Sequence, residues 1–67
     1  MNELELKAAW KQARPLGEWR KKCKREGRKP SWKDMQFVDR KMEAYGDREL
    51  YRDIDGSYYE DFISLGD

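Results

Sequence analysis

Carboxylates and aromatic rings alternate in the last quarter of this 67-residue chain. Carboxylates spaced along an extended segment take positions that phosphates occupy on the nucleic-acid-binding surface of a protein, as in a DNA mimic. Tyrosine and phenylalanine rings are typical anchors of protein interfaces. We therefore predict that this segment binds a host protein with a basic nucleic-acid-binding surface. The predicted partner-binding residues are Asp53, Asp55, Tyr58, Tyr59, Glu60, Asp61 and Phe62.

A second candidate surface is basic and lies earlier in the chain. Phosphates bind such side chains through charge and the release of counterions, and an exposed Trp10, Trp19 or Trp32 would stack on bases. The sequence has no helix-turn-helix, zinc-finger or RNA-recognition signature, and a solvated helix face is the alternative. The residues of this surface are Arg20, Lys21, Lys24, Arg25, Arg28 and Lys29.

The charges of the chain are sorted by position. Residues 1–30 hold ten lysines and arginines against four acids, a net of +6, and residues 31–67 hold five against ten, a net of −5. The distribution of charge decides which partners are attracted more than the net charge of +1 does. The two halves could also neutralise each other within the molecule, so this alternative stays open beside the two candidate surfaces.

The residue types of the chain give little support for a metal site, a cofactor or an enzyme. Aligning Gly56 with the obligatory glycine of an EF-hand loop puts Phe62 where a bidentate glutamate is required, which excludes calcium. Zinc is excluded because the chain has no histidine and a single cysteine, and we expect no cofactor. We also expect no enzyme, because the commonest general base is missing and a short chain rarely encloses a cleft. The spacing of Cys23 predicts a small core residue.

The composition indicates one small domain. Charged residues make up 43% of the chain, which favours partial disorder, but nine aromatic residues favour a compact core. The segment after Met1 has no signal-peptide pattern and no membrane-spanning run occurs, so we expect the protein in the cytoplasm, or in the host cytoplasm if it is viral. In size, charge density and tryptophan content the chain resembles small accessory proteins of bacteriophages and mobile elements.

Two short helices are predicted in the basic half. Residues 2–13 contain good helix formers with acids in the first turn, and Pro15 should end this helix. A second helix is predicted over residues 16–26, with Gly27 as its left-handed C-terminal cap. Its apolar side would be formed by Leu16, Trp19 and Cys23.

A third helix is predicted over residues 32–45. Ser31 is a good N-cap with Asp34 three residues later, which is a variant of the capping box. Gly46 should end the helix. Its apolar residues at helical spacing are Met35, Val38, Met42 and Tyr45.

Beyond Gly46 the pattern favours a β-hairpin. Aromatic and β-branched residues flank Asp55 and Gly56, which are a two-residue turn signal. We predict that residues 50–54 pair with residues 57–62. The alternative is an acidic, loosely ordered tail whose rings dock on the helices or on a partner.

These elements predict a mainly α fold, a three-helix domain with a C-terminal acidic hairpin or ordered tail, with α+β as the alternative. Residues 1–67 form a single domain, in which residues 1–46 are helical and residues 47–67 form the acidic-aromatic hairpin or tail. The predicted core consists of Leu6, Trp10, Leu16, Trp19, Met35, Val38, Met42 and Tyr45, joined by Tyr51, Ile54 and Phe62 if the tail docks.

The function expected first is that of a non-enzymatic accessory protein. It would modulate or inhibit a host complex that handles nucleic acid, such as a polymerase, a restriction or CRISPR complex or a repair nuclease, by docking the acidic-aromatic surface on a basic groove. The alternative is direct binding of DNA or RNA through the basic residues 14–29. A further alternative is a structural or assembly subunit whose charged halves pair head to tail, and the sequence leaves the oligomeric state open.

Overall fold

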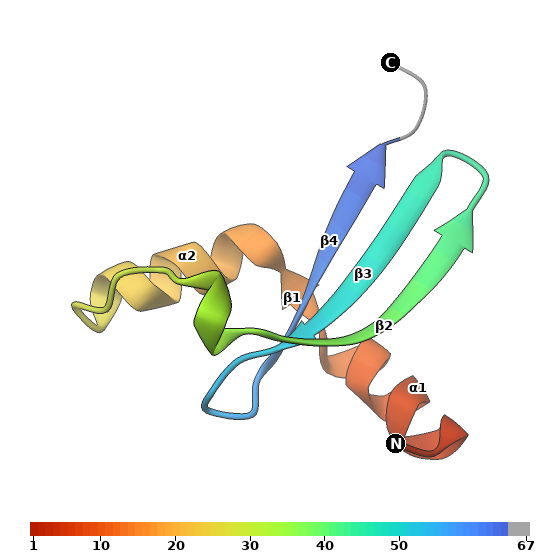
Figure 1. Ribbon diagram of the computed structural model, residues 1–67, viewed down its shortest axis with the longest axis horizontal. Helices are drawn as coiled ribbons and strands as arrows, with labels where there is room; N and C mark the ends of the chain where they lie inside the picture. The colour runs from red at the N-terminus through yellow and green to blue at the C-terminus, as the bar shows by residue number, and fades with distance from the viewer. Residues whose placement is uncertain (65–67) are drawn as a thin grey trace.

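The computed structural model describes residues 1–64 and consists of two helices and a four-stranded mixed sheet (Figure 1). The predicted mainly α fold is therefore wrong, and the fold is α+β. Residues 65–67 of the predicted tail lie outside the described residues. In chain order the elements are α1 (Glu3–Gln12), β1 (Arg14–Pro15), α2 (Leu16–Arg25), the 3-10 turn η1 (Trp32–Asp34), β2 (Gln36–Glu43), β3 (Gly46–Arg52) and β4 (Tyr58–Ser64).

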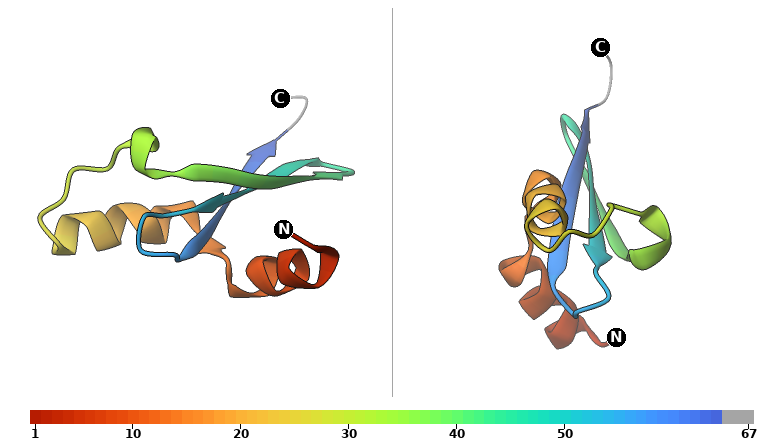
Figure 2. Two further views of the ribbon diagram at one scale, coloured as in Figure 1. Left: turned by 60° about the horizontal axis from the view of Figure 1, so that its bottom comes forward. Right: turned by 90° about the vertical axis from the view of Figure 1, so that its left-hand side faces the viewer.

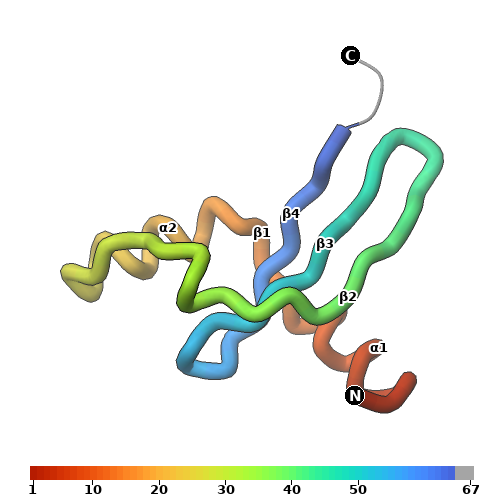
Figure 3. The backbone as a smooth tube through the Cα atoms, in the orientation of Figure 1, coloured from red at the N-terminus to blue at the C-terminus, as the bar shows by residue number. Residues whose placement is uncertain are grey.

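The strands lie in the order β1-β4-β3-β2, and the backbone path is easiest to follow in Figure 3. Neighbouring strands are antiparallel except β1, which runs parallel to β4 at the edge. Tyr51 of β3 lies opposite Phe37 of β2 and Tyr59 of β4, so three rings share one face of the sheet. Leu50, opposite Asp39, points to the other face.

The two helices pack on opposite faces of this sheet. Tyr59 contacts α2, whereas Trp10 of α1 donates its indole N–H to Asp39 Oδ2 at 3.0 Å. Because Asp39 and Leu50 share a face, α1 covers the Leu50 side. Figure 2 shows α1 beneath the strands and α2 projecting from one end of the sheet. The core on the α2 side is formed by Leu16, Trp19, Cys23 and Tyr59, with Met35 packed against them.

Both helices predicted in the basic half are confirmed. The side chain of Asn2 accepts a hydrogen bond from the backbone N–H of Glu5 at 2.8 Å and caps α1. Pro15 separates the helices, and Gly27 follows α2 with a φ of +69°, in the left-handed region. Cys23 is a buried core residue, as predicted.

The predicted third helix is wrong, so residues 1–46 are not wholly helical. Ser31 does cap a turn, its Oγ accepting from the backbone N–H of Lys33 at 3.3 Å, but the turn ends after Asp34. Residues 36–43 instead form β2, because pairing with β3 satisfies their backbone and sets Phe37 against a ring of β3. Two predicted core residues, Met42 at 85% and Tyr45 at 83%, are exposed, while half-buried positions are held by Leu6, Trp10, Met35 and Val38.

The predicted C-terminal strands do pair, but through a longer loop than expected. Asp53 to Ser57 form the connection, in which the backbone N–H of Asp53 donates to the Ser57 carbonyl at 2.8 Å. Gly56 has a φ of +90°, which supplies the turn. The two-residue turn is therefore wrong. Ile54 and Phe62 are exposed and lie outside the core.

Candidate functional site

A buried carboxylate lies where β3 ends. The side chain of Asp53 is fully enclosed, and Lys22 Nζ and Arg28 Nη2 lie 2.8 and 2.7 Å from its Oδ2. The backbone N–H of Ile54 donates to its Oδ1 at 2.9 Å. Lys22 Nζ also lies 2.7 Å from Asp55 Oδ2, in the loop. We call these four charged residues the Asp53 cluster, and they tie α2 and the segment after it to the β3–β4 loop.

Electrostatics keep this cluster ionised at neutral pH. Burial acts to raise the pKa of Asp53, but hydrogen bonds from Lys22 and Arg28 outweigh it, so this pKa lies below its usual value. The hydrogen bond from Lys22, with that from the backbone of Ser57, lowers the pKa of Asp55 to about 2. Burial acts to lower the pKa of Lys22, yet its two carboxylate partners raise it. The cluster is thus a set of fixed internal ion pairs.

The seven predicted partner-binding residues do not share one surface. Asp53 and Asp55 belong to the Asp53 cluster. Tyr59 is buried, and Lys22 Nζ lies 5.0 Å from its ring centroid. Side chains alternate between the two faces of a strand, which divides the β4 residues between the α1 and α2 sides. On the α1 side lie Tyr58, Glu60 and Phe62, and on the α2 side lie Tyr59 and Asp61.

Arginines of the sheet bind further carboxylates of the acidic half. Arg48 Nη1 lies 2.9 Å from Glu60 Oε1, and the same guanidinium pairs with Glu43. Arg40 pairs with Asp47, which is buried at 5% exposure. These pairs raise the pKa of both arginines through hydrogen bonds to the carboxylates. Much of the acidic charge that the sequence displays is therefore matched within the molecule.

The outer face of α2 carries cations that the molecule does not match. They occupy positions i, i+1, i+4 and i+5, so they form two short rows one helical turn long. All four are exposed, and none takes part in an ion pair with another of residues 1–64. We call this set the α2 cationic face, and it consists of Arg20, Lys21, Lys24 and Arg25.

The other two predicted basic residues behave differently. Arg28 turns into the Asp53 cluster, and Lys29 is exposed in the loop that follows α2. Gly17 lies one turn before Arg20 and Lys21, in line with the α2 cationic face, and an added Cβ there would meet nothing within 4 Å. Two carboxylates lie nearby. Glu18 is half-buried at the margin of the face, and Glu26 Oε1 lies 3.8 Å from Arg28 Nε. Positive charge therefore dominates the face.

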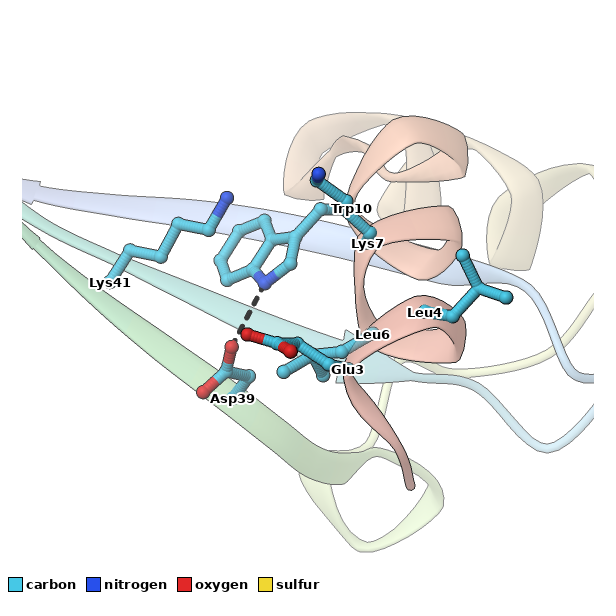
Figure 4. Close-up of a pocket in the computed structure, with 7 residues that line it drawn as sticks. All are labelled: Glu3, Leu4, Leu6, Lys7, Trp10, Asp39 and Lys41. Atoms are coloured by element: carbon cyan, nitrogen blue, oxygen red, sulfur yellow. Dashed lines mark hydrogen bonds between the residues drawn. The ribbon is translucent and has the colours of Figure 1, made fainter.

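An open groove of about 410 Å³ lies on the opposite side of the molecule, between α1 and β2 (Figure 4). The ring of Trp10 lines it, with Lys41 Nζ 4.5 Å from the ring centroid and Asp39 bound to the indole N–H. Two carboxylates and two ammonium groups line the groove, so its charges balance and select no single ligand chemistry. Its other lining residues are Glu3, Leu4, Leu6 and Lys7.

Other features of residues 1–64 leave the α2 cationic face as the main candidate. No three side chains of histidine, cysteine, aspartate or glutamate in this range come together to hold a metal ion, and none of its helices is long and apolar enough to cross a membrane. Cys23 is a buried free thiol, with Arg28 Nη2 3.3 Å from its Sγ. Comparison with protein-family models, curated proteins and solved structures gave no match.

Proposed function

We propose that the protein binds the phosphate backbone of a nucleic acid through the α2 cationic face. The observation that carries this proposal is the contrast between matched and unmatched charge. Five of the nine carboxylates among residues 31–64 have ion-pair partners at the Asp53 cluster or along the sheet, whereas the four cations of α2 have none among residues 1–64. Phosphates would supply the missing counter-charge, and release of their counterions would drive binding.

The anchoring of α2 to the sheet also favours this function. α2 buries Leu16, Trp19 and Cys23 against the sheet, and Lys22 fixes the same helix to the β3–β4 loop. Sites on anchored helices hold their geometry better than sites on loops. The four cations therefore have a fixed base, and the helix that carries them extends beyond the sheet (Figure 1).

The test is to replace Arg20, Lys21, Lys24 and Arg25 together by glutamine and to measure binding of a labelled nucleic acid by fluorescence anisotropy. Four phosphate contacts give the wild-type protein a slope of about −3 to −4 in a plot of log affinity against log salt, and the variant should lose this slope with its affinity. The matched control changes four exposed cations elsewhere to glutamine, namely Lys7, Lys11, Lys33 and Arg52.

Both variants have a formal net charge of +1 minus 4, or −3, so only the position of the lost charge differs. The proposal requires the control variant to keep most of the wild-type affinity. Equal losses in the two variants would contradict a specific role of α2. Absence of wild-type binding even at low salt would reject the proposal altogether.

Docking on a basic surface of a host protein is our second proposal, favoured by exposed apolar side chains at the other end of the sheet. Phe62 is 48% exposed and Ile63 44% exposed, and both lie at the end of β4 away from α2. Asp61 lies on the same face of β4 as Ile63. Changing Asp61 to Asn and Ile63 to Ser should reduce capture of a host protein from nuclease-treated lysate, while the α2 glutamine variant should not. Undiminished capture would count against this surface.

A further inference from the structure

We infer that the α2 cationic face takes double-stranded nucleic acid, with little preference for sequence. This inference rests on the proposed phosphate binding and names its substrate class. Two features carry it, namely the position of the aromatic rings relative to the cations and the spacing of the cations along the helix.

The tryptophans near α2 lie on the side of the helix away from its cations. Trp19 lies on the inner side of the helix and is 1% exposed. Trp32 packs between Trp19 and Tyr51, with ring centroids 5.5 and 5.3 Å away. Trp32 is 51% exposed, but these contacts place it in the ring cluster on the inner side of α2, away from the cations. Proteins that bind single strands combine a basic groove with rings that stack on successive bases, and α2 offers the charge without the rings.

The remaining tryptophan lies on the wrong side of the sheet. Trp10 belongs to α1, which packs on the face opposite to α2, and its indole N–H is held by Asp39. Lys41 already covers the ring, with Nζ 4.5 Å from the centroid (Figure 4). A nucleic-acid strand bound along α2 would have to pass around the sheet to reach the ring of Trp10. Base stacking therefore contributes little to any complex made by the cationic face.

The spacing of the cations suits the outside of a duplex. The two cations of each row are four residues apart, or about 6 Å along the helix. Each strand of a duplex presents a phosphate roughly every 3.4 Å along the axis, so each row faces about two phosphates and the four cations face about four. Gly17 lies one turn before Arg20, in line with the face, and has no side chain, which allows the phosphate backbone to approach that end of the helix closely.

The same helix has few groups that distinguish base pairs. Its sequence, LGEWRKKCKR, contains no asparagine, glutamine, serine or threonine. Reading of base edges would be confined to guanine contacts by the cations of the face and a cytosine contact by Glu18 at its margin, and the same cations bind phosphates equally well. Positioning contacts therefore outnumber contacts that could specify sequence.

The experiment compares a labelled duplex, each of its separated strands and a second duplex of shuffled sequence over a range of salt. We expect the duplexes to bind more tightly than the strands, with a slope near −3.6 for about four phosphates against about −2.8 for a single strand. The two duplexes should agree within about threefold, because one directly read base pair changes affinity by about tenfold or more. Tryptophan fluorescence should stay unchanged on saturation.

Tighter binding of a separated strand, or quenching of tryptophan emission by it, would overturn the inference. A difference above tenfold between the duplexes would overturn its statement on sequence. These outcomes leave the proposed phosphate binding intact as long as the α2 glutamine variant loses affinity and its charge-matched control does not. Failure of every nucleic acid to bind at low salt would instead reject the proposed function itself.

Discussion

The two helices have the same length but are held to the sheet in different ways. α2 buries three side chains and joins the Asp53 cluster through Lys22. α1 buries only Ala9, and its polar link to the sheet is the bond from Trp10 to Asp39. α1, rich in Ala, Leu and Glu, is favoured by local propensity, whereas α2 depends on tertiary contacts. The helix with the unmatched cations is thus the one fixed most firmly to the core.

The largest effect should come from the buried ring of α2. Replacing Trp19 by alanine leaves a cavity and should cost about 3 to 5 kcal/mol, which is a large part of the roughly 3 to 10 kcal/mol expected for a domain of this size. Replacing Trp10 by alanine should cost clearly less, because its ring is half-buried. Urea unfolding followed by circular dichroism measures both values. Equal losses would refute the difference in anchoring between the helices.

The next effect concerns the buried charge that holds α2. Asp53→Asn keeps the shape of the side chain but leaves Lys22 and Arg28 facing a neutral amide, so stability should fall by about 3 kcal/mol. Asp55→Asn is the matched control, because the Asp55 side chain is 45% exposed and its ion pair should contribute at most about 1 kcal/mol. Chemical denaturation separates the two values. A loss for Asp53→Asn no larger than that of the control would mean that packing alone anchors α2.

Acid should weaken the same anchor. The folded-state pKa of Asp55 lies at about 2, below its usual 3.8, and that of Asp53 is lowered as well. Their stabilising effect is therefore fully present above about pH 4 and is lost as the pH falls from 4 toward 2. Thermal unfolding across this range should show a smaller pH dependence in a variant with asparagine at both positions than in the wild-type protein. Parallel curves would show that other carboxylates govern acid unfolding.

The local part of the fold could be predicted from the sequence. Good helix formers, the break at Pro15 and the cap at Gly27 act within a few residues, so both helices were found. The helix prediction for residues 32–45 was wrong because their helical spacing competes with pairing to a strand that comes later in the chain. Ser31 supplied a true cap, yet one that closes a single turn. Local signals do not reveal such long-range pairing.

The candidate site was predictable in its residue types but not in its partners. The exposed cations of α2 follow from helical periodicity once the buried side is known. The hydrogen bond from Arg28 to Asp53 joins residues that are 25 positions apart and depends on the packing of α2 on the sheet. The local sequence therefore does not predict it. The sequence did contain evidence that residues 58–62 do not form one continuous surface, since a strand sends alternate side chains to opposite faces. Strand periodicity thus divides what looks contiguous in the sequence.

The smallest effect compares a glycine of α2 with the glycine that follows this helix. An added Cβ would meet nothing within 4 Å at Gly17 or at Gly27, but Gly27 has a φ of +69°. Gly17→Ala should therefore raise stability by about 0.5 to 1 kcal/mol, and Gly27→Ala should lower it by about 1 kcal/mol. Thermal or urea unfolding gives both values, and the same sign for both variants would contradict the backbone argument.

Gly17→Ala also tests why a weak helix former lies in line with the α2 cationic face, one turn before its first cations. The methyl group would fill the open space at that end of the face, where a phosphate backbone could approach the helix closely. If close approach matters, the variant should be more stable than the wild-type protein and should bind a duplex less tightly in the anisotropy assay. A gain in stability with unchanged affinity would restrict the binding role to the four charged side chains of the face.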